Sequence, residues 1–464
     1  MNKLGSYKCR AKGVKAPHKK NTAKYEPVMI KIPKEVKLPM SMHSGTPANP
    51  VVNTGDYVKV GQVIGEASGF VSSPVHASVS GTVKSIETVD SLTGEKAVTI
   101  TITSDGSQTP WEGIAPPAVT NLKEFLEAVR NSGVVGLGGA GYPTAPKFTL
   151  KDTVNLDYIL INGAECEPYI TSDTRTMVDQ TDYVWEGVLL MKEYLKPKNI
   201  VICIENNKPE PIKKLNDLVL KAKSAGLDGI SVRVLPSLYP QGERKVLVYN
   251  VTGRIVPEGG RLPDVGCIVV NCTTVATFAK YIITGNPLVS KCITVDGPAV
   301  KNPKNVIAPI GTPVRDIFEH IGGLLTDGNL NENIKKVTLG GPMMGVAIPN
   351  IDIPIVKITN AVLAFNAKDA SPPEPGPCIK CGKCLFNCPM NLMPPNIENA
   401  YELKKPELLK KFKVNMCAEC ACCAFTCPAK RPLVQVMKLA GNMLWEYEQE
   451  QKAKKTASQN KEAK

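Results

Sequence analysis

The spacing of apolar and polar residues divides the chain into regions with different expected structures. From Ile30 to about Ser104, short runs of Val, Ile and Thr are separated by turn sequences such as NTGD and LTGE. This pattern predicts a β-rich module over residues 1–108. Over residues 118–275, the apolar runs DYILING and NIVICIEN alternate with the helical pattern of PIKKLNDLVLKAKSAG. Such alternation predicts an α/β domain with a largely parallel sheet.

Two further folded regions and a tail are expected after the α/β domain. Residues 285–335 contain a strand pattern, a turn-rich stretch and a helix that begins near Pro313, which together predict a small β-grasp domain. The hinge SPPEPGP leads into residues 370–445, where NIENAYELKKPELLKKFKVN has a helical pattern. Residues 446–464 lack apolar periodicity, so a disordered basic tail is expected there.

Composition narrows the class of protein. With 464 residues, 43% of them hydrophobic, the chain is expected to be globular and multidomain. No apolar run approaches the roughly 18 residues that cross a bilayer, and no secretory signal is expected at the N-terminus. The net charge of +13 fits a solvated lysine-rich surface or docking to an acidic partner or anionic membrane face. Aromatic residues make up only 5%, and no basic stripe accompanies them, which argues against nucleic acid as a partner.

The cysteines carry the most specific chemistry. Nine of the 15 lie between Cys378 and Cys427, in two runs with the spacing C-x2-C-x2-C-x3-C-P. This is the spacing of bacterial two-cluster ferredoxins, in which the fourth cysteine of each run binds the cluster of the other run. Zinc sites and disulfides are the less favoured interpretations. We therefore predict a helix-bearing ferredoxin domain with two [4Fe–4S] clusters, one held by Cys378, Cys381, Cys384 and Cys427, the other by Cys417, Cys420, Cys423 and Cys388.

The remaining cysteines and the histidines are expected to be structural. Cys422 is extra to the ferredoxin pattern and is predicted to be a packed thiol. The isolated cysteines are predicted to be small buried hydrophobic residues: Cys9, Cys203, Cys267, Cys272 and Cys292. The four histidines form no cluster in the sequence: His18, His43, His76 and His320.

A glycine-rich segment, GVVGLGGAGYPTAPKF from Gly133, contains a match to G-x-G-x-x-G. A Rossmann turn needs a strand directly before this motif and a helix directly after it. Here the helical pattern NLKEFLEAVRNSG precedes it, and Pro143 and Pro146 follow closely. We expect that helix to bury one face made of Leu122, Phe125, Leu126 and Val129. The flanks favour a phosphate loop of backbone N–H groups, with Lys147 supplying positive charge, over a dinucleotide turn or a mere tight turn.

Several motifs together carry a family resemblance. GVVGLGGAGYPTAPKF, NGAECEPYITSDTR, YPQGERK, VNCTTVA, GGPMMG and the two ferredoxin runs resemble the C subunit of the Rnf ion-translocating electron-transport complex. The N-terminal GG-[IV]-H-P signature of that family reads GVKAPHKK here. The middle domain is also similar to the flavin-bearing 51 kDa subunit of complex I, whose loop is not a classical Rossmann turn. The β-rich module resembles the barrel-sandwich fold of biotinyl and lipoyl domains without their modifiable lysine, and the β-grasp domain is expected to be SLBB-like.

The resemblance implies a set of cofactor-binding residues. Gly136, Gly138, Gly139 and Gly141 would line the FMN phosphate and ribityl chain, with Lys147 nearby. Asn162 and Glu165 would contact FMN, although Ala164 replaces an aspartate of the complex I motif. Glu167 would face NADH, and Asn271 and Thr273 would contact phosphate. No catalytic residue beyond the cofactors is expected, because the cofactors carry the chemistry.

The function implied is that of a ferredoxin:NAD oxidoreductase subunit. NADH would reduce FMN, and electrons would pass through both clusters to membrane and flavoprotein subunits, reversibly and coupled to ion translocation, with ferredoxin acting indirectly. The chain would be peripheral on the cytoplasmic face of the membrane. Two alternatives stay open: a soluble flavin and iron–sulfur reductase, such as a cobalamin reductase or an amino-acid-reductase electron donor, and a ferredoxin-like relay without NADH binding.

Overall fold

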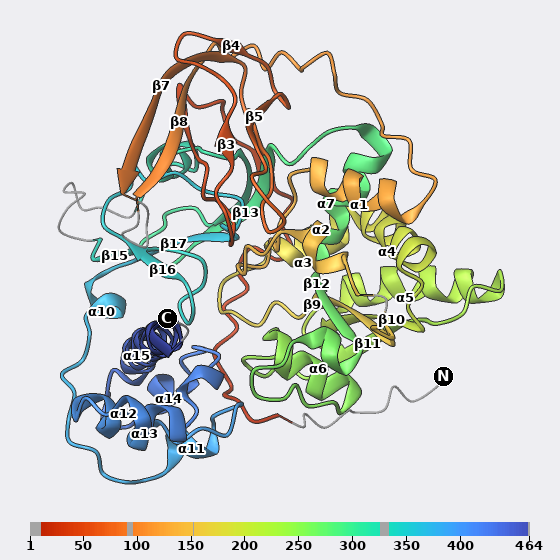
Figure 1. The fold of residues 1–464 in the computed structure, drawn as a ribbon. Helices are drawn as coiled ribbons and strands as arrows, with labels where there is room; N and C mark the ends of the chain where they lie inside the picture. Colours follow the sequence, from red (N-terminus) through yellow and green to blue (C-terminus); the bar gives the residue numbers. More distant parts are fainter. Residues whose placement is uncertain (1–10, 91–95, 152, 325–333, 463–464) are drawn as a thin grey trace. The chain divides into compact units, whose positions relative to one another are not determined.

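The computed structural model describes residues 11–90, 96–151, 153–324 and 334–462. The chain forms two compact units (Figure 1). The larger unit comprises Pro17–Leu235 and Gly260–Ser371, and the smaller unit comprises Met1–Ala16, Pro236–Gly259 and Pro372–Lys464. Residues 236–259, expected in the α/β domain, thus belong to the unit that contains the cysteine runs. Cys9 lies outside the described residues.

The N-terminal module of the larger unit is β-rich, as predicted. One sheet has the order β2-β8-β7-β4 and the other has the order β3-β5-β6, with antiparallel pairing throughout. Alternate residues of β2 and β8, such as Leu38 and Ile100, are fully buried, which is the pattern of a sheet with one face in the core. The strands are β2 (Glu35–Pro39), β3 (Asn49–Pro50), β4 (Tyr57–Val58), β5 (Val63–Glu66), β6 (Val75–His76), β7 (Gly81–Asp90) and β8 (Lys96–Ser104).

The predicted parallel sheet is present in the middle of the larger unit. Its strand order is β11-β10-β9-β12, and all three pairings are parallel. The strands are β9 (Tyr158–Gly163), β10 (Asn199–Glu205), β11 (Ile230–Leu235) and β12 (Cys267–Asn271). The helices are α1 (Leu122–Asn131), α2 (Thr144–Phe148), α3 (Ser172–Asp179), α4 (Thr181–Leu195), α5 (Pro209–Ser224) and α7 (Cys272–Thr284), with a 3-10 turn at Leu262–Val265. Helix α7 continues past the expected domain end at residue 275.

Helix α1 differs from its prediction at one position. Asn121 caps it by accepting a hydrogen bond from the Glu124 N–H group, and Phe125 and Val129 are buried. Leu122 lies in the first turn and is 46% exposed, so the buried face is narrower than expected. The Phe125 ring packs against Phe148, Tyr194 and Phe278, which fixes the helix that leads into the glycine loop.

The β-grasp region is larger than the sequence pattern indicates. Its six-stranded sheet has the order β1-β14-β13-β17-β15-β16 and continues to Phe365, beyond the expected limit at residue 335. The stretch predicted to be turn-rich contains β14, and β1 comes from the N-terminal region. Helix α8 begins after Pro313, as expected. The elements are β1 (Val28–Met29), β13 (Ser290–Asp296), β14 (Lys304–Pro309), α8 (Val314–His320), β15 (Lys336–Leu339), β16 (Val346–Ile348), β17 (Ala361–Phe365) and α10 (Ala367–Ala370).

The smaller unit is helical. The helix expected between the cysteine runs is broken into α12 and α13, because Pro406 cannot continue α12 and instead begins α13. Its elements are α6 (Arg244–Thr252), α11 (Lys383–Phe386), α12 (Pro394–Glu402), α13 (Pro406–Lys411), α14 (Cys422–Phe425), α15 (Leu433–Glu462) and a 3-10 turn at Val414–Met416.

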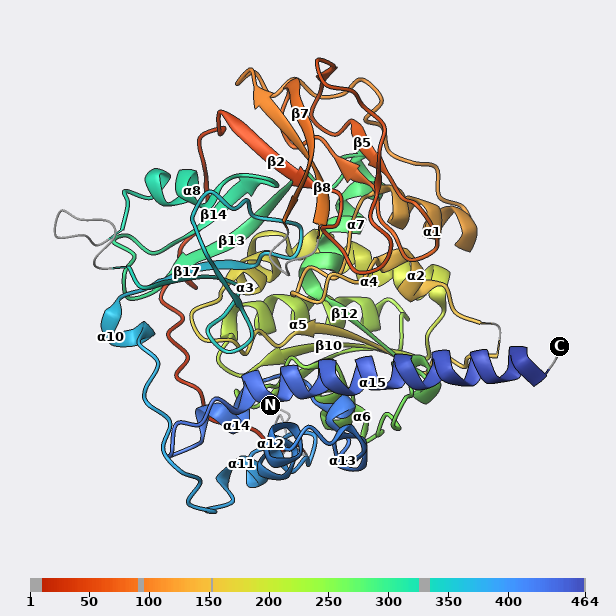
Figure 2. The same cartoon turned by 60° about the vertical axis from the view of Figure 1, so that its left-hand side comes forward.

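The expectation of a disordered tail after residue 445 is wrong, because α15 continues as one long helix to Glu462 (Figure 2). The segment is rich in Ala, Lys, Gln and Glu, which favour a helix without needing apolar periodicity. In the part of the chain that the structure describes, none of the helices is both long enough and apolar enough to cross a membrane.

Candidate functional site

The glycine segment forms a closed loop between α1 and α2. The Gly136 N–H group donates to the Tyr142 carbonyl at 2.9 Å, and the Gly141 N–H group donates to the Gly136 carbonyl at 3.0 Å. Gly139 has a φ of +103°, and no atom lies within 4 Å of the point that a Cβ atom would occupy. A helix precedes the loop, and the next strand starts only at Tyr158. The prediction that this is not a Rossmann turn therefore agrees with the fold.

The loop is attached to the first turn of α7. The Leu137 N–H group donates to Thr274 Oγ1 at 3.0 Å, and Thr274 Oγ1 donates to the Val135 carbonyl at 3.0 Å. A Cβ atom on Gly138 would lie 2.9 Å from Asn271 Nδ2, so the backbone there approaches Asn271 as closely as only glycine allows. Glycine N–H groups and the start of a 13-residue helix thus lie together, an arrangement suited to an anion.

The sheet topology places two predicted residues beside this loop. Asn162 is near the end of β9 and Asn271 ends β12, and the two are paired in register. The chain runs from β9 outward through β10 and β11 and then returns to the other side of β9 for β12. The carboxyl ends of β9 and β12 therefore form a topological switch point, where open α/β sheets bind ligands.

Asp173 connects three of the predicted residues and was missed by the sequence analysis. Its carboxylate accepts hydrogen bonds from Asn271 Nδ2 at 2.7 Å and from Thr273 Oγ1 at 2.6 Å. Its backbone N–H group donates to Glu165 Oε1 at 2.7 Å. The available signal was its place in NGAECEPYITSDTR, one of the motifs that carried the resemblance.

Glu165 and Glu167 have different surroundings. Glu165 is buried, and its other carboxylate oxygen accepts from Thr174 Oγ1 at 2.7 Å. Burial, opposed mainly by the charge of Lys20, raises the pKa of Glu165 to about 7. The Glu167 carboxylate accepts from the N–H groups of Met343 and Met344 at 3.1 and 2.9 Å, so it binds the turn GGPMMG. The structure thus brings Glu165, but not the carboxylate of Glu167, to the Asp173 cluster.

The lysine contacts also differ from the prediction. Lys147 Nζ donates to the Val269 carbonyl of β12 at 3.3 Å. Two other ammonium groups contact the glycine segment: Lys291 donates to the Leu137 carbonyl at 2.8 Å, and Lys357 donates to the Gly133 carbonyl at 2.7 Å. Lys291 is buried, and its burial lowers its pKa to about 8. Sequence reasoning missed it because a lysine within the apolar strand KCITVD carries no local sign of this contact.

The cysteines of the smaller unit fall into two groups that mix the two runs. Burial, followed by the nearby charges of Cys427 and Cys378, raises the pKa of Cys384. Burial, followed by the charges of Cys420 and Cys388, raises the pKa of Cys417 to about 12. The charges of Cys417, Cys420 and Cys388 likewise add to burial in raising the pKa of Cys423. Cys384 and Cys417 thus each have a charged neighbour from the other run, and the two ligand sets stay a prediction. Cys381 lies exposed in the loop between Cys378 and Cys384.

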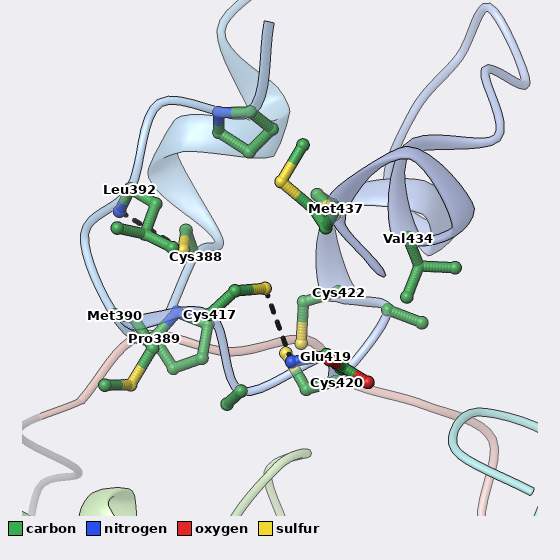
Figure 3. A pocket seen from close by; sticks show the side chains of 14 residues that line it. Cys388, Pro389, Met390, Leu392, Cys417, Glu419, Cys420, Cys422, Val434 and Met437 are labelled. Atoms are coloured by element: carbon green, nitrogen blue, oxygen red, sulfur yellow. Dashed lines mark hydrogen bonds between the residues drawn. The ribbon is translucent and has the colours of Figure 1, made fainter. Parts of the chain in front are cut away.

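The second group lines a pocket (Figure 3). Cys388, Cys417, Cys420 and Cys423 all line it, and apolar side chains such as Leu392 and Met437 complete its wall. The Leu392 N–H group donates to Cys388 Sγ and the Glu419 N–H group donates to Cys417 Sγ, each at 3.3 Å. Backbone N–H donors to sulfur are a feature of iron–sulfur sites.

The donor set of this pocket suits an iron–sulfur cluster. Its wall includes the thiols of Cys388, Cys417, Cys420 and Cys423, and two of them accept backbone N–H groups. Cysteine thiolates are the ligands of [4Fe–4S] clusters. The residues present therefore fit such a cluster.

The other cysteines agree with their predictions, with one addition. Cys203, Cys267, Cys272 and Cys292 are buried. Cys422 is buried in the wall of the pocket, and its thiol donates to the Tyr239 carbonyl at 3.8 Å. Cys166, for which the sequence offered no expectation, is half-buried between Glu165 and Glu167.

Comparison with known proteins identifies three regions of the chain. The family model of the RnfC barrel sandwich hybrid domain matches residues 9–107, that of the Nuo51 FMN-binding domain matches residues 129–280, and that of the SLBB domain matches residues 292–347. These matches confirm a multidomain α/β protein with a barrel-sandwich module and an FMN-binding domain of the complex I type.

Two curated relatives match most of the chain. The C subunit of the Na(+)-translocating ferredoxin:NAD(+) oxidoreductase complex of Acetobacterium woodii is 38% identical over 83% of this chain and 85% of its own length. The C subunit of the proton-translocating ferredoxin:NAD(+) oxidoreductase complex of Clostridium ljungdahlii is 38% identical over 81% of this chain and 80% of its own length. A solved NAD+-reducing [NiFe]-hydrogenase matches 70% of this chain and 61% of its own chain, with 15% identity and a TM-score of 0.49, a likeness too weak to support an argument. The chain belongs to the RnfC family, the C subunits of the ion-translocating ferredoxin:NAD(+) oxidoreductase complexes that its motifs resemble.

Proposed function

We propose that the chain is the NADH-oxidising subunit of an ion-translocating ferredoxin:NAD+ oxidoreductase complex. It would hold FMN in the larger unit and two [4Fe–4S] clusters in the smaller unit. Bound FMN supplies an acceptor for hydride that releases electrons one at a time, and each cluster carries single electrons. The observation that carries the proposal is the combination of two features: the glycine loop, which is hydrogen-bonded to the start of α7 at the switch point, and a pocket lined by cysteines of both runs.

The residues of the larger unit would bind and orient the flavin and NADH. Gly136, Gly138, Gly139 and Gly141 would line the FMN phosphate and ribityl chain, with Lys147 and Lys291 near the loop. The Asp173 carboxylate holds Asn271 and Thr273 in place beside it. Asn162 and Glu165 would contact FMN, and Glu167 would face NADH once its hydrogen bonds to the 343–344 backbone are exchanged for ligand.

The residues of the smaller unit would hold the clusters. Cys378, Cys381, Cys384 and Cys427 would bind one, and Cys388, Cys417, Cys420 and Cys423 the other. Apolar residues around the second group would exclude water from its cluster.

Electron transfer would continue to membrane and flavoprotein subunits, with ferredoxin acting elsewhere in the complex. The direction would be reversible and coupled to ion movement. The chain would sit peripherally on the cytoplasmic face through these subunits. Support comes from the relatives, each named as the C subunit of such a complex. These relatives favour this assignment over a soluble cobalamin-reductase-like or amino-acid-reductase-linked enzyme.

Reconstitution tests the proposal. The full chain is loaded anaerobically with iron, sulfide and FMN, and NADH is then added while the flavin absorbance is followed. Bleaching of the flavin is expected, and its absence would contradict the NADH role. Affinity purification from detergent-solubilised membranes should recover membrane subunits with the chain. A chain that is recovered alone, and is fully active without membranes, would favour the soluble reductase instead.

A further inference from the structure

The N-terminal segment 18–22 binds the loop that carries Glu165 and Glu167. Lys20 Nζ donates to the carbonyl oxygens of Glu165 and Glu167, each at 2.8 Å, and to that of Ile170 at 2.5 Å. The three oxygens satisfy all three N–H groups of the ammonium. Lys20 is only half-buried as a residue, but its charged end is enclosed by this loop.

The neighbours of Lys20 hold the same loop at further points. Thr22 is fully buried and shares a hydrogen bond with Thr171 across 2.5 Å between their Oγ1 atoms. The Tyr169 N–H group donates to the His18 carbonyl at 3.0 Å. Tyr169 has a φ of +70°, a left-handed conformation that a bulky residue keeps only when its surroundings impose it.

A second lysine, which follows the loop in the sequence, also binds it. Lys208 Nζ donates to the Glu165 carbonyl at 3.3 Å, and its main partner is the buried Glu205 carboxylate at 2.7 Å. Lys208 is therefore neutralised by Glu205, whereas each hydrogen bond that Lys20 donates goes to a carbonyl of the 165–170 loop. Loss of the Lys20 ammonium would remove this donor from all three carbonyls, and Lys208 would still donate to that of Glu165.

We propose that Lys20 is a positioning residue of the NADH end of the cofactor site, which fixes the backbone of residues 165–170 and thereby the placement of Glu165 and Glu167. The inference rests on the proposed function and assigns a role in it to a segment outside the FMN-binding domain. The ammonium acts through the backbone of the loop. Small displacements of groups that position a substrate are costly for a reaction.

Hydrogen exchange and steady-state kinetics test this role together. In Lys20→Met, amide exchange in residues 164–173 should accelerate, while exchange in the buried strands β9 and β10 keeps the wild-type rate. In the reconstituted full chain, the KM for NADH with ferricyanide as acceptor should rise roughly tenfold or more, with a smaller fall in kcat. Lys24→Met is the matched control, because Lys24 is an exposed lysine four positions along. The Lys24→Met variant should keep the wild-type exchange rates, KM and kcat.

Three results would overturn the proposal. One is a folded Lys20→Met with wild-type exchange in the loop and wild-type KM. Another is acceleration spread equally over β9 and β10, which would mean a general stabilising role. The third is an equal effect in Lys24→Met.

Where Lys20→Met does not fold, Lys20→Gln replaces it, because its shorter, uncharged side chain keeps polarity in the site but has two N–H donors for three carbonyls and cannot hold the loop as the ammonium does. Rapid loop exchange is expected in this variant as well, and wild-type exchange would again overturn the proposal. If the wild-type chain itself binds no FMN, the proposed function fails. The exchange comparison on the flavin-free chain still decides whether Lys20 holds the loop.

Discussion

Single residues at the switch point show how the candidate flavin site is assembled. Asp173 joins Asn271, Thr273 and Glu165 through three hydrogen bonds of 2.6–2.7 Å. Gly138 lies so close to Asn271 that a side chain would displace it. The glycine, the asparagine and the aspartate are therefore parts of one packed arrangement.

Substitution of Gly138 tests the glycine loop. In Gly138→Val, the side chain must displace Asn271, so FMN binding should weaken by about 1–3 kcal/mol, the usual cost of overpacking. Fluorescence titration with FMN measures the effect, and iron content should not change. Gly441→Val is the control, because Gly441 lies in α15, outside the proposed loop, and no atom lies within 4 Å of its added Cβ. Normal FMN affinity in Gly138→Val would show that the loop does not bind the cofactor.

His76 should make stability depend on pH. It is 5% exposed, and Nδ1 has no hydrogen-bond partner among the described residues. Burial, and then the charge of Lys357, lowers its pKa from 6.5 to about 3. A lowered pKa stabilises the fold above pH 6.5, and this contribution is lost as the pH falls from 6.5 towards 3, at about 1.4 kcal/mol per pH unit.

Denaturant unfolding of wild type and His76→Leu across about pH 4.5–6.5 measures this contribution. The free energy of unfolding of the variant should fall less steeply with acidification. Equal slopes would mean that His76 is not buried in its neutral form.

At the scale of elements, α4 packs closely against α7. Gly187 lies in α4, and a Cβ atom there would come within 2.4 Å of Val275 Cγ1 and 2.8 Å of the Val275 carbonyl oxygen, both in α7. The close approach of α4 sets the position of α7, and the first turn of α7 contacts the glycine loop. The contact between α4 and α7 thus supports the glycine loop through the first turn of α7.

Gly187→Ala should lower the thermal unfolding midpoint, even though alanine favours a helix by about 1 kcal/mol over glycine. Forcing α4 from α7 should cost about 1–3 kcal/mol and outweigh that gain. Gly441→Ala in α15 provides the control, because no atom lies within 4 Å of its added Cβ, so it should stabilise or have no effect. A Gly187→Ala variant as stable as wild type would refute the close packing.

At the scale of the whole molecule, the two units divide the proposed chemistry between them. The larger unit contains the glycine loop and the switch point, and the smaller unit contains both cysteine groups. The segment 236–259, which includes YPQGERK, is part of the smaller unit, where the Tyr239 carbonyl accepts from the thiol of Cys422. Residues remote in sequence thus complete the unit that would hold the clusters.

The crossed ligand sets predict which cluster each cysteine controls. Cys427→Ala should remove the cluster held by Cys378, Cys381 and Cys384, and Cys388→Ala should remove the other. In each case iron content should fall from about eight to about four per chain. The two variants should lose different electron paramagnetic resonance signals after reduction. Cys422→Ala should keep both clusters, and loss of the same signal in both ligand variants would contradict the crossing.

Local features of this protein follow from the order of its residues alone. Cysteine spacing predicts the crossed ligand sets, because a short loop limits which irons its thiolates can reach. The helix before the glycines and the prolines after them argue against a Rossmann turn, because that turn needs a strand directly before it. Alternating apolar runs likewise predict the parallel sheet.

Which distant residues meet is known only from the folded chain. Lys291 and Lys20 have no distinguishing local pattern, since a buried charge is recognised by its partners, and those partners come from other parts of the chain. The motif that contains Asp173 does not show which residues its carboxylate contacts. The extent of the β-grasp sheet was also missed, because β1 and β17 join it by pairing with strands far along the chain. Patterns among neighbouring residues are visible in the sequence. Contacts between residues far apart in the chain are decided only by the tertiary fold.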